Sequence, residues 1–200
     1  SLVGSEMCIR DSAKEAPKPF ALPEPYGTMR RMYAYLMRQR HIDREVISYF
    51  VHEKLLYEDK HHNCVFVGLD DSGETKHAHI RSTNSEGRVF RMNIEGSVSE
   101  HCFHKDGTDK SLYVFEAPID LMSHASIAAD FYGRDWMQDH RISTGCLWNG
   151  AIDRYLEGHP QIKRLVFAVD NDYLARDKNG QLRNLSLIHI SEPTRLRCIS

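Results

Sequence analysis

The chain has 200 residues and a formal net charge of −2, and 41% of its residues are hydrophobic. This length suffices for one domain and part of another. The weakly acidic balance excludes a chain-wide basic footprint for nucleic acid, so any such contact must depend on local patches. No apolar run approaches the roughly 20 residues that span a bilayer, so we expect no membrane partner.

Both ends of the chain have the appearance of translated adapter DNA. Residues 7–12 are Met-Cys-Ile-Arg-Asp-Ser, and residues 185–190 are Leu-Ser-Leu-Ile-His-Ile. A DNA sequence that encodes most of the first segment has a reverse complement that encodes most of the second. The pair therefore resembles one library-preparation element translated in opposite orientations. We expect residues 1–12 and 185–200 to be non-native tails, and the natural protein to continue past Asn184.

The remaining cysteines bear on the cellular compartment. Without the tails these are Cys64, Cys102 and Cys146, and no two of them form a Cys-x-x-Cys pair. An odd and scattered set is typical of free thiols in a reducing compartment. We therefore expect a cytoplasmic protein.

The first half of the chain predicts a helical pair and then an antiparallel meander. Residues 13–27 are rich in proline and charge and predict a linker. Thr28 is a candidate N-cap for a helix that ends near Arg38, and Asp43 is a candidate cap for a second helix. Three strand patterns separated by turn residues follow, over residues 64–69, 76–83 and 88–94.

The second half changes to an alternation of strands and helices. We expect strands at 112–115, 142–147 and 162–169, with helices at 119–131 and 148–156. Pro118 suits a first helical turn, where its missing amide hydrogen would be unpaired in any case. Alternation with short connections predicts a parallel sheet with flanking helices.

Acidic residues follow two of these strands. Glu116 ends the first strand pattern, and Asp170 and Asp172 end the last. Ligands gather at the carboxyl ends of strands in open parallel sheets. The two aspartates would leave one face of an extended chain about 6–7 Å apart. Their repulsion, roughly 2–3 kcal/mol at an effective dielectric of about 20, favours a bound hard divalent cation.

These motifs resemble the Toprim domain of bacterial primases, topoisomerases and some nucleases. The resemblance begins with Glu-x-Pro-Ile-Asp at 116–120 and Asp-Asn-Asp at 170–172. Upstream stretches in the same order are similar to the primase-like Toprim proteins of bacterial plasmids and conjugative elements, whose function is uncharacterised. These stretches are residues 35–43, 46–50, 56–58, 65–68, 81–83 and 96–97. The resemblance covers most of residues 20–176.

The resemblance implies an α/β fold in two parts. Residues 28–108 would form an N-terminal α+β primase-like segment, with the helical pair and the meander. Residues 109–184 would form a C-terminally truncated Toprim parallel sheet with flanking helices.

The resemblance also implies roles for individual residues. Glu116 would act as general acid or base or as a metal neighbour, and Asp170 and Asp172 would bind Mg²⁺, with Mn²⁺ as a substitute. Asp120 matches a further acidic residue of primases and would join the metal site. Three departures weaken the match, namely Ala117 in place of glycine, Arg176 after Ala175, and Val98-Ser99-Glu100 where relatives carry a lysine.

Structural explanations compete with each of these roles. The paired aspartates could cap a helix, Asp120 could complement a helix dipole, and Glu116 could form an ordinary ion pair. Several arginines could bind nucleic-acid phosphates or simply form a solvated helix face. These arginines are Arg30, Arg31, Arg38, Arg40 and Arg81, with Arg44 beside them.

A zinc site is not expected from the sequence, although zinc-ligand residue types are present. Their spacing matches no standard zinc site. The candidate set is His61, His62, Cys64, His101, Cys102 and His104.

Two classes of function remain open. The first is Mg²⁺-dependent phosphoryl or nucleotidyl transfer on nucleic acid, particularly primase-like synthesis on DNA in mobile-element replication or transfer, with nuclease cleavage as its neighbour. Replication or conjugation proteins are its expected partners. The second is a non-catalytic module that binds DNA or protein through a degenerate Toprim scaffold.

Overall fold

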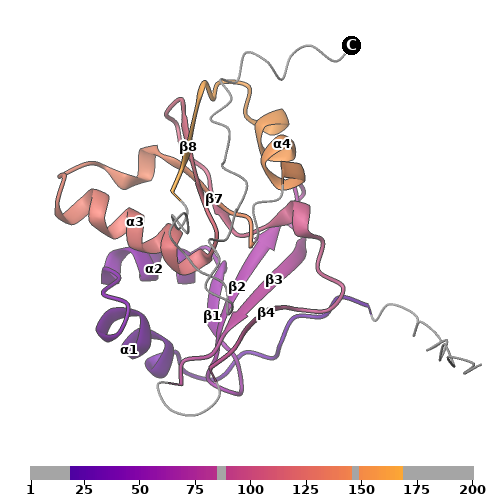
Figure 1. The fold of residues 1–200 in the computed structure, drawn as a ribbon. Helices are drawn as coiled ribbons and strands as arrows, with labels where there is room; N and C mark the ends of the chain where they lie inside the picture. The colour runs from indigo at the N-terminus through magenta and orange to yellow at the C-terminus, as the bar shows by residue number, and fades with distance from the viewer. Residues whose placement is uncertain (1–18, 85–88, 146–148, 169–200) are drawn as a thin grey trace, which may run out of the picture.

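The computed structural model describes residues 19–84, 89–145 and 149–168, and Figure 1 shows their arrangement. These residues contain two four-stranded sheets, with the strand orders β1-β2-β3-β4 and β5-β7-β6-β8. None of the described helices is long and apolar enough to cross a membrane. Both predicted tails lie outside the described residues, and the predicted domain division at residue 108 stays a prediction.

The first helix, α1 (Arg30–Arg38), is capped from another part of the chain. The predicted cap at Thr28 is wrong, because the N-cap position is Met29, whose side chain makes no capping hydrogen bond. The backbone N–H of Met32 instead donates to the buried carboxylate of Glu58, at 2.9 Å. A residue of β1 therefore satisfies a donor that helix starts leave unpaired.

The second helix, α2 (Arg44–His52), has the predicted local cap. The carboxylate of Asp43 accepts a hydrogen bond from the N–H of Glu45, at 2.6 Å. The aspartate also precedes a helix whose buried residues lie on one side, as the sequence pattern indicates.

The predicted meander is present as an antiparallel sheet in chain order. The strand β2 agrees with the sequence pattern residue for residue, whereas β4 is shorter than expected and β1 was missed. A strand as short as β1 offers too little alternation to be recognised. The four strands are β1 (Leu56–Glu58), β2 (Cys64–Leu69), β3 (Thr75–Arg81) and β4 (Arg91–Asn93).

The second sheet has parallel pairing at its centre, as alternation predicted. The strand β6 pairs in parallel with β7 and β8, and β5 pairs antiparallel with β7. Short 3₁₀ turns, η1 (Ser99–His101) and η2 (Trp136–Gln138), precede β5 and β7. The strands are β5 (His104–Lys105), β6 (Ser111–Phe115), β7 (His140–Ser143) and β8 (Arg164–Phe167), and the helices are α3 (Pro118–Asp130) and α4 (Asn149–Gly158).

The strand β6 is buried on both faces. Tyr113 and Phe115 belong to the core that contains α1, α2 and α3, whereas Leu112 and Val114 pack with residues of α4. Figure 1 accordingly shows α3 and α4 on opposite sides of the second sheet. Phe103 joins this sheet to the meander, because its ring lies 5.4 Å from that of Phe66.

A buried ion pair holds the chain before β7. The carboxylate of Asp139 lies 2.9 Å from a guanidinium nitrogen of Arg141, and both side chains are 0% exposed. The same guanidinium donates to the carbonyl oxygen of Trp136, and Arg134 pairs with the other carboxylate oxygen. A buried charge is tolerated only when it is paired and hydrogen-bonded in this way.

We expect Asp139→Asn to lower the free energy of unfolding by about 3–5 kcal/mol, because Arg141 would remain buried without its carboxylate. Urea denaturation measures the change. Asp71→Asn is the matched control, because it removes an arginine partner at the surface, where the Asp71 side chain is 94% exposed. Equal losses in the two variants would contradict the role of the buried pair.

Candidate functional site

The carboxyl ends of three parallel strands meet at Glu116. Its carbonyl oxygen accepts a hydrogen bond from the N–H of Gly145, after β7, at 2.9 Å. On the other side of β6, Ala168 donates its N–H to Val114 O at 2.9 Å. The Glu116 side chain is half-buried at this edge.

Asp120 lies close to Glu116, in the first turn of α3, where it is exposed. The predicted partners Asp170 and Asp172 lie outside the described residues. The convergence of the carboxylates on one metal ion therefore stays a prediction.

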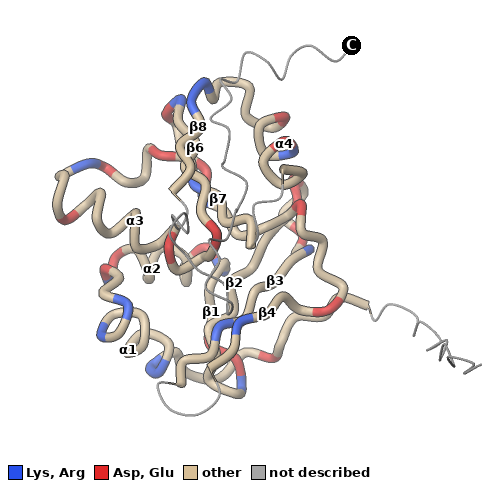
Figure 2. Tube along the Cα trace, viewed as in Figure 1, with Lys and Arg blue, Asp and Glu red and all other residues tan. Residues whose placement is uncertain are grey.

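A pocket of about 160 Å³ lies between the meander and the start of α3. Arg81 and Arg91 line it from the meander, Arg40 lines it from the helical pair, and the chain that follows Glu116 lines it from the other side. Figure 2 shows the basic residues beside β4. The lining residues are Arg40, Phe66, His79, Arg81, Arg91, Ala117, Pro118, Ile119 and Asp120.

Two of these arginines are oriented by one buried tyrosine. The hydroxyl oxygen of Tyr35 accepts hydrogen bonds from the Nε atoms of Arg40, at 2.9 Å, and Arg81, at 3.3 Å. The Arg40 guanidinium also lies 5.4 Å from the centre of the Tyr35 ring. Both guanidinium groups therefore have restricted orientations, and each carries further N–H donors besides Nε.

The third arginine lies directly opposite one of the first two. Arg81 and Arg91 are partners in the register of β3 and β4. Like charges at opposed positions of an antiparallel pair destabilise a sheet. A bound anion would offset this repulsion, and guanidinium groups suit phosphate or carboxylate oxygens.

His79 lies in the same pocket but adds no charge near neutral pH. Burial, reinforced by the nearby Arg81 and Arg91, lowers the pKa of its imidazole below the usual range. Its Nδ1 atom lies 2.8 Å from the side-chain oxygen of Asn93. The positive charge of the pocket therefore comes from the arginines.

The structure separates the arginines that the sequence grouped together. Arg40 and Arg81 reach the pocket. Arg30 lines a different groove on the helical pair, Arg31 donates to Asn84 at 2.5 Å, and Arg38 is exposed on α1.

Sequence reasoning missed two pocket residues, His79 and Arg91. For His79 the available signal was its spacing from Arg81, because residues 79 and 81 share one face of β3. That signal becomes specific only when the pairing of β3 with β4 is known.

The six candidate zinc ligands named from the sequence do not gather into one site. Cys64 is buried in the core, and burial raises the pKa of its thiol. His62 pairs with Glu58 at 2.5 Å. Among the described residues, the group with ligand atoms close enough for one metal ion is Asp106, His140 and His159.

A family model of unknown function matches less than half of the chain. A family model described as "Protein of unknown function (DUF3991)" matches residues 34–116. The match covers the helical pair, the meander and the chain as far as Glu116. No curated protein matches the sequence.

Solved structures give the fold. The primase fragment of the bacteriophage T7 primase-helicase protein is 14% identical, with a TM-score of 0.52, over 80% of this chain and 64% of that chain. The fold is similar to that of a primase core. The DnaG primase catalytic domain bound to ssDNA is 13% identical, with a TM-score of 0.45, over 76% of this chain and 56% of that chain. The chain thus spans less than two thirds of either structure.

We expect Arg81→Gln to weaken the binding of inorganic pyrophosphate by about 10-fold or more, because hydrogen bonds to charged groups contribute about 1.5–3 kcal/mol. Isothermal titration calorimetry at two salt concentrations measures the affinity and its salt dependence. The matched control is Arg38→Gln, which removes an exposed arginine outside the pocket. An equal loss in the control would show that general surface charge, rather than the pocket, binds the anion.

Proposed function

We propose that this protein catalyses Mg²⁺-dependent nucleotidyl transfer on nucleic acid, in the manner of a primase, during replication or transfer of mobile-element DNA. The observation that carries the proposal is the position of Glu116. In a fold similar to a primase core, this residue lies where the strand ends meet, beside a pocket with three arginines.

The residues at this edge suit a hard divalent cation. Carboxylate oxygens are the ligands that Mg²⁺ prefers, and Asp170 and Asp172 would hold the ion, with Asp120 in the adjoining helical turn. When bound, Mg²⁺ would neutralise charge on the reacting phosphate. Glu116, at the end of β6, would accept or deliver the proton.

The arginine pocket supplies the second requirement of the reaction. Phosphate groups of a nucleotide or of the nucleic-acid strand would bind between Arg40, Arg81 and Arg91. Tyr35 holds two of these guanidinium groups in fixed orientations, so less conformational entropy is lost when phosphate binds. The pocket continues to Asp120, so bound phosphate would lie next to the acidic edge.

Replacement of glycine by alanine after Glu116 is compatible with this proposal. Ala117 has φ −125° and ψ 150°, an extended conformation that any residue adopts. The substitution therefore causes no backbone strain at the site.

We expect Glu116→Gln to reduce nucleotide incorporation on a single-stranded DNA template by about 100-fold or more, because it removes a proton-transfer group. Asp170→Asn should also reduce incorporation, and it should weaken Mn²⁺ binding because it removes a ligand. Labelled-nucleotide incorporation and Mn²⁺ electron paramagnetic resonance on the natural, uninterrupted protein give the two readouts, because the truncated Toprim sheet of the 200-residue chain is not expected to be active.

The matched control is Asp153→Asn, an exposed carboxylate on α4 that should leave both readouts unchanged. Mn²⁺ binding that survives Asp170→Asn would reject the metal role of that residue. DNA binding by the natural, uninterrupted protein without metal-dependent incorporation or cleavage would overturn the enzymatic proposal in favour of a non-catalytic binding module.

A further inference from the structure

A second group of metal-ligand side chains lies at the amino end of β7, whereas Glu116 lies at the carboxyl end of the neighbouring parallel strand β6. Asp106 follows β5, His140 is the first residue of β7, and His159 follows α4. One potential ligand atom from each of the three lies within 4.8 Å of the others. Three elements that are separate in the chain therefore present nitrogen and oxygen donors to one point.

Two histidines around this point have a defined tautomer. The Nδ1 atom of His159 lies 2.8 Å from the carbonyl oxygen of Tyr155, which can only accept, so Nδ1 carries the hydrogen. Its Nε2 atom then presents a lone pair 3.6 Å from the carboxylate of Asp106. Metal-binding histidines usually have this arrangement, with one ring nitrogen donating to a carbonyl or carboxylate.

His104 repeats the arrangement from β5. Its Nδ1 atom lies 2.9 Å from the carbonyl oxygen of Cys102, and its Nε2 atom lies 3.8 Å from the same Asp106 oxygen. His104 therefore contacts Asp106 from β5, beside the group of three whose ligand atoms all lie within 4.8 Å of one another.

His140 lacks one hydrogen bond that a buried imidazole needs. The residue is 0% exposed, and its Nε2 atom has no hydrogen-bond partner among the described residues. A buried polar atom without a partner costs about 1–3 kcal/mol. The Nδ1 atom of the same ring accepts a hydrogen bond from Gly107 N–H at 3.1 Å and lies 2.9 Å from the Tyr155 hydroxyl, so a metal ion bound by His140 would replace contacts of one ring nitrogen.

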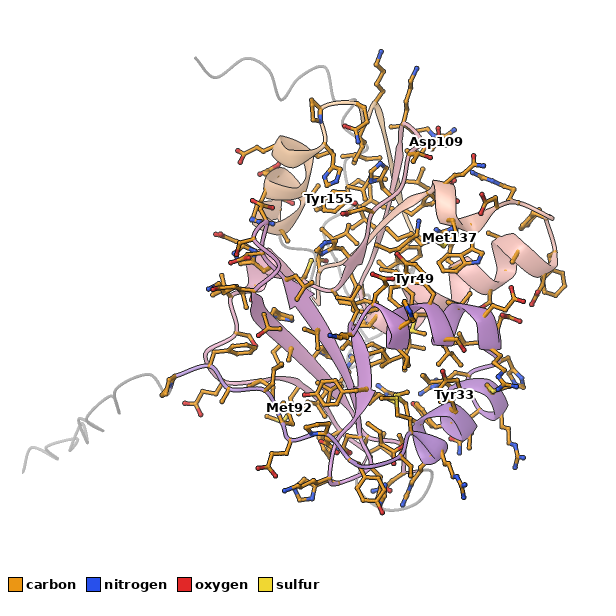
Figure 3. All side chains as sticks on the ribbon, turned by 180° about the vertical axis from the view of Figure 1, so that it is seen from behind. Tyr33, Tyr49, Met92, Asp109, Met137 and Tyr155 are labelled. Carbon is orange, nitrogen blue, oxygen red and sulfur yellow. The ribbon has the colours of Figure 1, made fainter. Side chains whose placement is uncertain are left out.

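The carboxylate and the loop that carries it are also held in place. The hydroxyl of Tyr155 donates to Asp106 at 2.8 Å, and its ring stacks on His159 with centroids 4.2 Å apart. Figure 3 labels Tyr155, which extends from α4 toward the second sheet. Gly107 allows the loop to approach β7, because a Cβ atom there would lie 2.2 Å from Gln138 O.

We propose that Asp106, His140 and His159 form a binding site for a divalent transition metal ion such as Zn²⁺. Imidazole nitrogens suit Zn²⁺ and not Mg²⁺, so this site differs in chemistry from the acidic edge. Ligand atoms of a tetrahedral zinc ion lie about 3.3 Å apart, given bonds of about 2.0–2.1 Å. The separation of 3.6 Å between His159 Nε2 and the Asp106 carboxylate is close to this value, and the ligand atoms of the group as a whole lie within 4.8 Å of one another.

The bound ion would connect β5, the start of β7 and the end of α4. A metal ion that binds only the folded chain adds its binding free energy to stability. The site is therefore structural, and it does not depend on the proposed nucleotidyl transfer.

We expect the metal-free 200-residue chain to bind Zn²⁺ and to gain thermal stability when it does so. His159→Gln and Asp106→Asn should each weaken Zn²⁺ binding by about 10-fold or more and reduce the gain in Tm, because the first removes an imidazole ligand and the second removes the negative charge of the carboxylate ligand. Competition with a chromophoric chelator measures the affinity, and Co²⁺ absorption reports the ligand geometry. Both side chains are partly exposed, so circular dichroism without metal should match the parent chain.

The matched control is His61→Gln, an exposed histidine outside the cluster that should leave Zn²⁺ affinity unchanged. Excess Mg²⁺ should not displace the ion. Zn²⁺ affinity that survives both ligand substitutions, or that falls equally with His61→Gln, would overturn the proposed site.

Discussion

The burial of β6 on both faces is the constraint on which the rest of this structure depends. Its side chains alternate between two cores, with Phe115 facing α3 and Val114 facing α4. Because neither face can turn to solvent, a register shift of one residue would exchange every one of these contacts. At the carboxyl end of the strand, Glu116 is the first residue that is half-buried rather than buried. The same packing that stabilises the sheet therefore also positions the carboxylate.

The arginine pocket beside that carboxylate contains like charges that destabilise the sheet without a ligand and favour the binding of an anion. The pairing of Arg81 opposite Arg91 is unfavourable for a sheet that has no ligand. The hydroxyl of Tyr35 keeps Arg81 next to Arg40, which brings a further positive charge to the same place. By contrast, the buried guanidinium of Arg141 is neutralised by Asp139 within the fold. Within the described residues, Arg141 thus has a carboxylate partner, whereas Arg40 and Arg81 share a tyrosine hydroxyl beside the pocket.

Local sequence signals succeeded where the stabilising contact is itself local. Asp43 caps α2 through a residue two positions away, and β2 has a long enough apolar run to be recognised. The start of α1 could not be predicted in this way, because Glu58 supplies the cap from 26 residues further along. The two sheets and the alternation of the second half were foreseeable from periodicity, and the exact strand ends were not.

The sequence by itself determined the order of the elements and the position of Glu116 after a buried strand, because hydrophobic periodicity and helix caps act over a few residues. Only the tertiary structure decided which charges meet. Arg91 and His79 become pocket residues through the pairing of β3 with β4, and Arg40 joins them through the packing of the helical pair. Likewise, Asp106, His140 and His159 converge because β5, β7 and α4 pack together. Such convergence depends on contacts between distant segments, which no local pattern encodes.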